Sequence, residues 1–274
     1  RLLEPSPAAD AYEVCAADAP PLMLRPSATA RAWATWAEVP EADGGALLAA
    51  LGGSRLLTLW KALLLGRRVL FYAPPPVGRL CERALSAHQL TVGWAGCCAP
   101  HAAPRTELLL YVGLNDEQEL LQRSPHAGIR FIAKPEGGGE GQGYIACTTD
   151  RLLADKSDTW DVFVDDQGAL KVGVLDARAL TLSATDEARY KQLSALLSAD
   201  GAPSDDRVTR YFAAESATLL QGLRALVDEG VTEVQPKHLK RLHLGDNDAT
   251  FLRLLVAQHD DIRLTVKVHR FRCC

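Results

Sequence analysis

The glycine-rich run Gly137–Gly143, with the sequence GGGEGQG, has the composition closest to that of a phosphate-binding loop. Such a loop follows a strand and opens a helix, so that backbone N–H groups point at the anion, and it usually ends in Gly-Lys-Ser or Gly-Lys-Thr. Here the glycines precede a predicted strand that begins at Tyr144, and no Lys-Ser pair follows them. The pattern therefore favours a surface loop over a nucleotide site.

The cysteines offer thiol or metal chemistry, but their spacing supports neither. Their number is odd, no C-x-x-C pair occurs, and the two adjacent pairs are poorly placed for zinc, which needs ligands on spaced turns. Reduced thiols in the cytosol are the favoured interpretation. Cys147 has no histidine near it in sequence, and a buried thiol on a strand is usually inert. The seven cysteines are Cys15, Cys81, Cys97, Cys98, Cys147, Cys273 and Cys274.

No other spacing predicts catalysis. The chain contains no G-x-S-x-G elbow, no H-E-x-x-H helix and no paired-carboxylate motif. His238 and His243 lie among Lys237, Lys240 and Arg241 and form a local basic patch with them. We interpret this patch as a solvated face that can touch acidic lipid. We therefore predict no catalytic residue, no metal ligand and no cofactor.

Two loops that follow predicted strands are better candidates for contact with a partner. The sequence Cys147-Thr-Thr-Asp150 lies between a strand and the segment Arg151–Lys156. In parallel α/β sheets such loops gather at the carboxyl edge, where ligands and partners bind. Helix capping by Thr149 or Asp150 is the plainer role, and a cap also fixes the loop that a partner touches. The residues that we expect to contact a partner are Thr148, Thr149, Asp150, Pro74 and Pro75.

Lys61, Arg67 and Arg68 form a positive cluster at the end of an apolar helix. The helix dipole favours cations at a helix C-terminus, so their position needs no partner to explain it. We predict a structural role for all three.

Apolar spacing predicts the elements that position these residues. Leucines recur every three or four residues from Ala46 to Gly66, which predicts a helix that is kinked or divided at Gly52-Gly53. A strand over Val69–Tyr72 follows, then Pro74–Pro76, then a helix from Leu80 to about His88. Further strands are predicted at Leu108–Val112, Ile129–Ala133, Tyr144–Cys147, Thr159–Val164 and Leu170–Val174, with a helix over Asn115–Gln122.

The remainder of the chain is predicted to be mainly helical. One helix begins at Thr185–Glu187, a linker covers Asp200–Asp206, a long amphipathic helix runs over Val208–Val227 and stops at Gly230, and another contains Phe251–Leu255. The alternating strands and helices before it indicate an α/β fold. We expect a central, mostly parallel sheet flanked by helices, followed by a C-terminal helical subdomain.

Composition sets the outer limits. A chain of 274 residues, 47% hydrophobic and 23% charged, can bury a sizeable core. Its formal charge is -4 and it has no long basic block, which argues against nucleic acid as a partner. The longest apolar runs fall far short of the ~20 residues of a membrane-spanning helix, and no signal peptide is visible. The start at Arg1 and the single methionine, Met23, suggest a processed, trimmed or fragmentary chain.

Two segments carry a resemblance to a known family. Leu56–Gly78 reads LLTLWKALLLGRRVLFYAPPPVG, and Tyr144–Asp165 reads YIACTTDRLLADKSDTWDVFVD. The first resembles the helix, basic doublet and strand that open the central module of DENN-domain proteins. Both resemble the versions found in the LCHN and late-secretory-pathway subgroup. Residues 199–274 resemble, more weakly, the helical downstream module of that family.

The resemblance implies three parts: an irregular segment over residues 1–45 that is a remnant of an upstream module, a central DENN α/β module over residues 46–198, and a downstream-like helical module over residues 199–274. It also implies a regulator of a Rab-type small GTPase in vesicle trafficking, as a guanine nucleotide exchange factor or as part of one. Such a factor is cytoplasmic, and it can sit peripherally on secretory or endosomal membranes. It binds the switch regions of the GTPase without covalent chemistry.

Two other functions stay open at this point. The first is a non-catalytic DENN-fold scaffold that assembles with another DENN protein, indicated by the apolar surface around the Leu47–Leu64 helix that a missing lobe would cover. The second is a metabolic enzyme, which has only the Gly137–Gly143 run to support it. The terminal Cys273-Cys274 pair resembles the geranylgeranylated double-cysteine ends of Rab proteins, which gives membrane anchoring as a minor hypothesis.

The part before the central module sets one further expectation. Complete DENN regions carry an upstream longin-like module, and the GTPase is bound between the two lobes. About 45 residues precede the predicted Leu47 helix, fewer than the ~100 residues of an independent module. We therefore expect weak or no nucleotide exchange by this chain alone.

Overall fold

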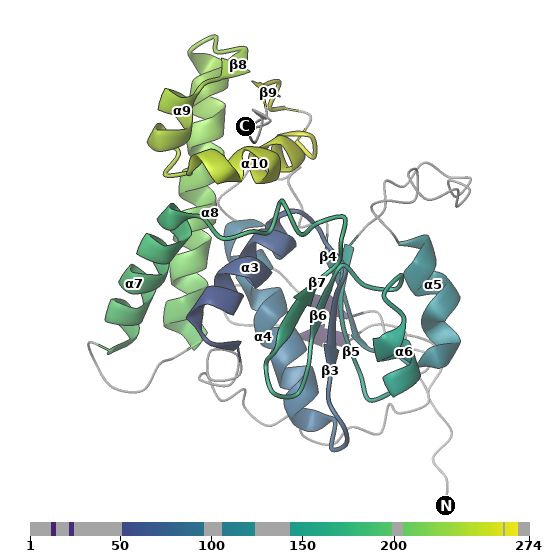
Figure 1. Cartoon of the computed structure of the whole chain (residues 1–274). Helices are drawn as coiled ribbons and strands as arrows, with labels where there is room; N and C mark the ends of the chain where they lie inside the picture. The colour runs from purple at the N-terminus through teal and green to yellow at the C-terminus, as the bar shows by residue number, and fades with distance from the viewer. Residues whose placement is uncertain are drawn as a thin grey trace, which may run out of the picture.

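The computed structural model describes residues 12–14, 22–24, 51–95, 106–123, 143–198, 205–259 and 261–267. At its centre lies a five-stranded sheet with the strand order β4-β5-β3-β6-β7. Helices cover the sheet on both faces (Figure 1). The fold is therefore of the α/β class predicted from the sequence, with a central, mostly parallel sheet.

Four strands of this sheet are parallel, and their bounds follow the apolar runs of the sequence. They are β3 (Val69–Tyr72), β4 (Thr106–Tyr111), β5 (Gly143–Thr148) and β6 (Val162–Val164). β3 pairs with β5 and β6, and β4 pairs with β5. β7 (Leu170–Val172) is antiparallel to β6 and forms one edge. Because parallel strands end at the same edge, the loops after β3, β4 and β5 are neighbours.

The two faces of the sheet bury different helices. α3 (Gly53–Leu64) and α4 (Gly78–Ala95) lie on one face, and α5 (Glu117–Gln122) and α6 (Arg151–Asp155) lie on the other (Figure 1). Along β3, Val69 and Phe71 belong to the cluster that contains α3 and α4, whereas Leu70 belongs to the cluster with α5 and α6. Successive side chains of a strand point to opposite faces. A strand covered on both faces therefore consists of consecutive apolar residues.

Helix α3 is separated from the residues before it, as the sequence predicts. Leu51 is helical, but Gly52, with a φ of 66°, interrupts the helix, and α3 begins directly after it. Gly66 has a φ of 56° and ends the segment. Glycine adopts this left-handed conformation without steric cost, which explains both positions. Every residue over 56–64 is buried, so α3 is a core helix.

The C-terminal part is mainly helical, as predicted. Its long helix, α8 (Asp205–Asp228), ends shortly before Gly230, whose φ is 76°. α8 packs against α4, and α7 packs against α3. The other elements are α7 (Ala184–Ser198), α9 (Pro236–Arg241), α10 (Ala249–Val256), the 3₁₀ helices η1 (Leu114–Asp116) and η2 (Asp246–Asp248), and the parallel strands β8 (Glu233–Val234) and β9 (Thr265–Val266).

One continuous cluster of buried side chains joins the sheet to the C-terminal helices. It includes Phe71 of β3, Phe212 of α8 and Phe251 of α10. Trp60 of α3 lies in the middle of this cluster, with its ring 5.6 Å from the ring of Phe212. Its indole N–H donates to Ser216 Oγ of α8 at 2.9 Å. The central sheet and the helical part therefore share a core.

Several boundaries differ from the predicted ones. α4 continues past His88 to Ala95, because Leu90 extends its buried stripe along α8. β6 begins at Val162 and not at Thr159, because the hydroxyl of Thr159 turns back to the Lys156 carbonyl at 2.8 Å. β7 ends two residues before the predicted end at residue 174, and α8 begins at residue 205, inside the predicted linker.

Other predictions fall on parts of the chain that the structure does not describe. They concern the strand over residues 129–133, the glycine run up to residue 142, the linker up to residue 204 and the Cys273-Cys274 pair. In the predicted irregular N-terminal segment, β1 (Tyr12–Val14) and β2 (Leu22–Leu24) form an antiparallel pair. Within the described ranges, no helix has both the length and the apolar character needed to cross a membrane.

Candidate partner-binding surface

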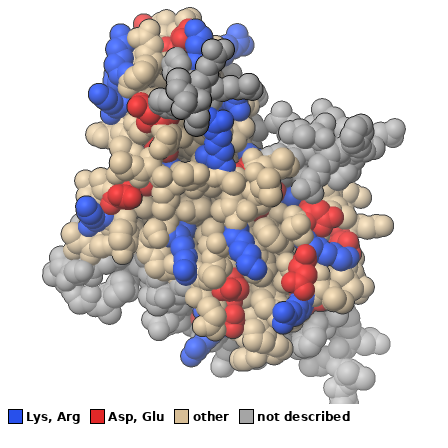
Figure 2. All heavy atoms as spheres, in the orientation of Figure 1, with Lys and Arg blue, Asp and Glu red and all other residues tan. Residues whose placement is uncertain are grey.

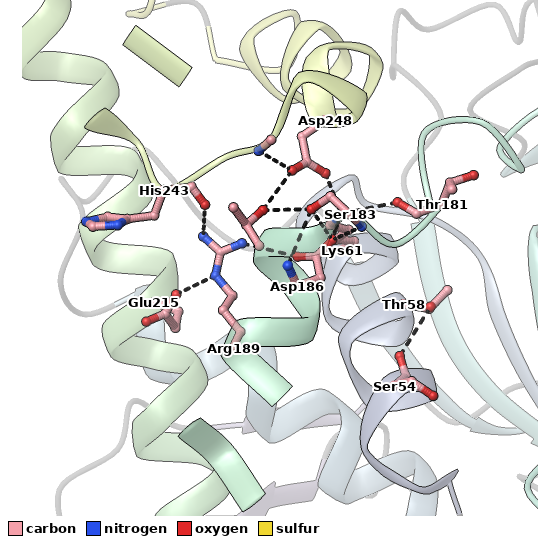
Figure 3. A network of polar contacts seen from close by, with 12 residues as sticks. Ser54, Thr58, Lys61, Thr181, Ser183, Asp186, Arg189, Glu215, His243 and Asp248 are labelled. Carbon is pink, nitrogen blue, oxygen red and sulfur yellow. Dashed lines mark hydrogen bonds and ion pairs between the residues drawn. The ribbon is translucent and has the colours of Figure 1, made fainter. Parts of the chain in front are cut away.

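The predicted positive cluster is buried, and its members pair with carboxylates. Lys61 of α3 is 0% exposed, and its ammonium contacts Asp186 of α7 and Asp248 of η2 (Figure 3). The distance from Lys61 Nζ to Asp248 Oδ1 is 2.7 Å, and the Thr181 carbonyl oxygen lies 3.4 Å from the same nitrogen. A buried charge is tolerated only with such partners. Lys61 therefore connects three elements.

Asp186 is the centre of this network (Figure 3). Its Oδ2 accepts hydrogen bonds from the backbone N–H and the hydroxyl of Ser183, at 2.9 and 3.0 Å. Burial alone would raise the pKa of Asp186, but the Lys61 ammonium and the Ser183 donors outweigh it and lower the pKa below its ordinary value. Asp186 is therefore stabilised as the ionised partner of Lys61.

Arg189 extends the network from α7 to α8. It donates to Asp186 Oδ1 at 3.1 Å, to Glu215 Oε2 at 2.8 Å and to the His243 carbonyl at 2.9 Å. Its guanidinium carbon lies 5.6 Å from the centre of the Trp60 ring. At this distance a cation over the face of an aromatic ring is attracted to it. Each charge in this cluster has a partner of opposite sign. We assign the cluster to the stability of the fold.

Arg67 and Arg68 show the same pattern at the start of β3. Arg68 forms a bidentate pair with Asp161, with distances of 2.8 Å for Nη2–Oδ1 and 3.2 Å for Nε–Oδ2. Arg67 Nε lies 2.8 Å from Asp176 Oδ1. Both arginines are buried, so the predicted structural role is confirmed. The reason differs from the prediction, because carboxylates from later loops, and not the helix dipole alone, hold these cations.

The loops after β3, β4 and β5 meet at the carboxyl edge of the sheet, as predicted. The register places Tyr72 opposite Thr148 and Tyr111 opposite Cys147, so the three strands end side by side. This arrangement brings the Pro74-Pro75 pair, which follows β3, next to the loop that follows β5. The two groups of predicted contact residues are therefore adjacent.

The loop Thr148–Asp150 is held by its own side chains. Thr148 Oγ1 accepts from the Asp150 N–H at 3.0 Å, and the Asp150 carboxylate accepts from the Leu152 N–H at 2.9 Å as the N-cap of α6. The hydroxyls of Thr149 and Tyr111 are 2.8 Å apart. The capping role predicted for this loop is confirmed for Asp150. The loop is thereby fixed to both α6 and β4.

Exposure separates the predicted contact residues into two groups. The Thr148 side chain is fully buried and positions the loop from within. Thr149 and Asp150 are half-buried, and Pro74 and Pro75 are exposed. The last four can touch a partner directly.

The sequence did not point to the apolar residues that the same edge exposes. Leu152 of α6 is 63% exposed, and Leu114, just after β4, is 39% exposed. One signal was present for Leu152: it is adjacent to Leu153, and a short helix on a sheet cannot bury two successive side chains. Leu153 is the one that is buried. We define the carboxyl-edge surface as Pro74, Pro75, Leu114, Thr149, Asp150, Arg151 and Leu152.

Two hollows lie away from this surface, among the C-terminal elements. The larger, of about 550 Å³, is lined by residues of α9, η2 and β9, including Leu239, Asp246 and Val266. The smaller, of about 360 Å³, has Arg189 and Glu215 on its wall. Neither is lined by a residue of the carboxyl-edge surface. Among the described residues, no cluster of His, Cys, Asp and Glu has the arrangement of a metal site.

The apolar surface expected around the Leu47–Leu64 helix is not found in the described part of that helix. Leu56, Leu59 and Trp60 are at most 1% exposed, because α4 and α7 pack against α3. The prediction of an exposed apolar surface on this helix, which had indicated a scaffold, is therefore wrong for residues 51–64. A different exposed apolar pair follows β7: Val174 is 92% exposed and Leu175 is 47% exposed.

Charges of both signs are interspersed over the visible face of the molecule (Figure 2). The predicted basic patch lies on and after α9, where Lys237, Lys240 and Arg241 are exposed. Arg241 donates to Glu229 at 2.6 Å, which neutralises part of this patch. The remaining positive charge is local.

Comparison with known proteins shows similarity to one family. A family model described as DENN domain-containing protein 11 matches residues 45–171, which include β3 to β6 and most of β7. DENN domain-containing protein 11 of Xenopus laevis is 27% identical over 229 residues, covering 78% of this chain and 48% of that protein. The protein of that name from Rattus norvegicus is 24% identical over 234 residues, covering 78% and 46%. The chain thus spans about half the length of these relatives.

The matched region contains both segments that carried the resemblance, on the helix α3, the strands β3 and β5 and the loop between β5 and α6. These matches support a DENN domain in this chain, within residues 45–171. The chain is similar to DENN domain-containing protein 11. The expected place in the LCHN and late-secretory-pathway subgroup stays a prediction.

Proposed function

We propose that this chain regulates a Rab-family small GTPase in vesicle trafficking, as a guanine nucleotide exchange factor or as part of one. The similarity to DENN-domain proteins carries the proposal, since proteins of that family generally regulate Rab GTPases. Exchange requires no covalent chemistry by the factor. It requires a surface with greater affinity for the nucleotide-free GTPase, which holds the switch segments in a shape that no longer supports the magnesium ion and the phosphates.

We assign the contact with the GTPase to the carboxyl-edge surface. Leu114 and Leu152 supply exposed apolar area, and Thr149 and Arg151 supply polar groups beside it. Apolar residues within a polar rim are typical of partner surfaces. The hydrogen bonds of the Thr148–Asp150 loop fix the backbone in advance, which lowers the entropy lost on binding.

A panel of Rab GTPases tests the proposed function. Each GTPase is loaded with a fluorescent GDP analogue, and release is timed with and without the chain. We expect weak or no acceleration by this chain alone, together with retention of at least one nucleotide-free Rab in a pull-down. Brisk release would show that the chain is sufficient for exchange. Failure to retain any Rab in any nucleotide state would remove the proposal.

The substitution Leu152→Asp tests the assigned surface. It replaces an exposed apolar side chain by a charge that a partner would have to desolvate, so we expect GTPase binding to weaken about tenfold or more. Val174→Asp is the control, because Val174 is also apolar and is even more exposed, at 92% against 63% for Leu152. It follows the end of β7, which pairs with the start of β6, so it lies away from the edge where β3 and β5 end. Equal losses in the two variants would contradict the assignment.

The alternative is a non-catalytic scaffold that assembles with another DENN protein. The observation that favours it is the adjacent exposed pair Val174-Leu175, beside the edge strand β7. An exposed sheet edge with apolar neighbours is suited to pairing with another chain. Purification as an obligate complex, without an effect on nucleotide release from any Rab, would support this alternative over exchange.

Together with the regulation of a Rab GTPase, we propose that the chain associates peripherally with secretory or endosomal membranes. Lys237 and Lys240 are exposed near the start and end of α9, beside the partly neutralised Arg241. Basic side chains of this kind attract anionic lipid, by about 1 kcal/mol each. Co-sedimentation with phosphatidylserine vesicles that weakens in high salt is expected. Equal sedimentation with neutral vesicles would contradict an electrostatic contact.

A further inference from the structure

Two buried cysteines face each other directly behind the carboxyl-edge surface. Cys81 lies in the first turn of α4 and Cys147 lies on β5, and their sulfur atoms are 3.6 Å apart. Both are free thiols, with Cys81 7% exposed and Cys147 0% exposed. The proposed function uses neither of them. Two facing thiols on different elements are a site for redox chemistry.

We propose that Cys81 and Cys147 form a reversible disulfide bond when the protein meets hydrogen peroxide, and that this bond ties the start of α4 to the end of β5. A disulfide needs an S–S distance of about 2.05 Å, so the two sulfurs must approach by roughly 1.6 Å. We assign this movement to the first turn of α4. It follows the exposed Pro74–Pro76 loop, and at Gly78 a Cβ would meet no heavy atom within 4 Å.

The two thiols are unequal, which sets the order of events. A hydrogen bond from the Cys147 thiol stabilises the Cys81 thiolate and lowers the pKa of Cys81, whereas burial raises the pKa of Cys147. Cys81 is also the more exposed of the two, at 7% against 0% for Cys147. Since the thiolate is the nucleophile, Cys81 reacts first and Cys147 resolves the product.

The reaction balances with peroxide as the only oxidant. The Cys81 thiolate attacks one peroxide oxygen, the O–O bond breaks, and hydroxide leaves and takes up a proton to become water. The Cys147 sulfur then attacks the sulfur of the Cys81 sulfenic acid, the S–O bond breaks, and the oxygen leaves as water with the proton of Cys147. Two thiols and one peroxide thus give one disulfide and two waters. A dithiol reductant reverses the oxidation.

The bond would clamp the two loops of the carboxyl-edge surface. Cys147 directly precedes Thr148–Asp150, and Cys81 follows closely after Pro74–Pro76. Movement of α4 toward β5 changes the position of one loop relative to the other. Resting on the proposed function, this predicts that the oxidised chain binds the nucleotide-free GTPase several-fold more weakly than the reduced chain.

Mass spectrometry of the full chain tests the disulfide independently of any GTPase. The reduced protein is exposed to a small excess of hydrogen peroxide at neutral pH, remaining thiols are capped with N-ethylmaleimide, and the protein is digested without reduction. We expect a peptide pair joined through Cys81 and Cys147 that dithiothreitol separates. Recovery of both thiols as capped peptides, or of a Cys81 sulfinic acid without the joined pair, would overturn the proposal.

Thermal denaturation gives a second readout. Because the bond closes a long loop, oxidation should raise the Tm by about 5–10 °C, and reduction should reverse the rise. In Cys81→Ala, which places a good helix former in the first turn of α4, oxidation should leave the Tm unchanged. A rise of the same size in this variant would assign the effect to other cysteines and overturn the proposal. A joined peptide pair with unchanged GTPase binding would support the disulfide and remove only its link to the surface.

Discussion

Lys61 shows how a single residue can hold distant segments of this chain together. Its ammonium contacts Asp186 and Asp248, which lie 125 and 187 positions away in sequence. Removing such charges from water carries a penalty of several kcal/mol per ion, and the attraction within the cluster repays it only with good geometry and further donors. Ser183 and Gly245 supply those donors to the two carboxylates. The cluster is therefore sensitive to the loss of one member.

Replacing Lys61 with methionine removes the cation paired with buried Asp248 and leaves buried Asp186 with Arg189 as its counter-charge. We expect the free energy of unfolding to fall by about 3–5 kcal/mol, measured by urea denaturation at neutral pH. The control is the triple variant with Lys61→Met, Asp186→Asn and Asp248→Asn, which removes all three charges and keeps oxygen acceptors for the same backbone donors. It should recover part of the loss. A loss below about 1 kcal/mol in the single variant would contradict the assignment.

His88 of α4 gives the fold a pH dependence. Burial lowers its pKa to about 4, whereas an unfolded histidine has a pKa of about 6.5. The unfolded chain therefore binds a proton at higher pH than the folded chain does. The stability contributed by neutral His88 is complete above about pH 6.5 and is lost as the pH falls toward 4, by about 3 kcal/mol in all. His88→Gln should flatten the dependence of unfolding free energy on pH in this window, and an unchanged slope would refute the explanation.

The junction of α3 and β5 shows a constraint at the scale of elements. Gly143, the last residue of the glycine run, begins β5, and a Cβ there would lie 2.0 Å from the carbonyl oxygen of Gly66. Gly66 itself has a positive φ and ends the α3 segment. Both groups belong to the backbone, so neither can move aside alone. The run that was interpreted as a surface loop therefore ends in a glycine that packing requires.

Gly143→Ala should lower the stability by about 3 kcal/mol or more, because the added methyl group forces β5 away from the start of β3. Gly78→Ala is the matched control. Its Cβ meets open space at the start of α4, so its effect should stay within about 1 kcal/mol. Thermal denaturation of both variants decides the matter. Equal shifts in Tm would show that the contact with Gly66 carries no weight.

The individual elements could be predicted because their signals are local. The strand Val69–Tyr72 was predicted with its observed bounds, since proline and glycine mark its ends and β-formers fill it. The adjacency of the loops after β3 and β5 followed from the rule for parallel sheets. The sequence could not show which of Leu152 and Leu153 is exposed, because that depends on which face of α6 packs against the sheet. The partners of Lys61 were hidden by their separation in sequence.

At the scale of the whole molecule, the α/β part and the helical part are coupled through a shared interior. The family resemblance divides the chain after residue 198, yet the buried cluster continues from β3 through α3 to α8 and α10. The Lys61 network crosses the same division, and α8 packs along α4. We propose that residues 46–198 and 199–274 are modules of sequence that fold as a single cooperative unit.

Phe212→Ala tests this coupling. Phe212 belongs to α8 and is 0% exposed, and its ring lies 5.6 Å from the ring of Trp60 of α3, so its truncation should lower the stability by about 3–5 kcal/mol. If the parts unfold together, hydrogen exchange followed by mass spectrometry should show the same loss of protection in peptides from β3 and β5 as in those from α8. Protection that falls in α8 alone would show that the helical part unfolds independently, and the shared interior would then be a contact between two separate units.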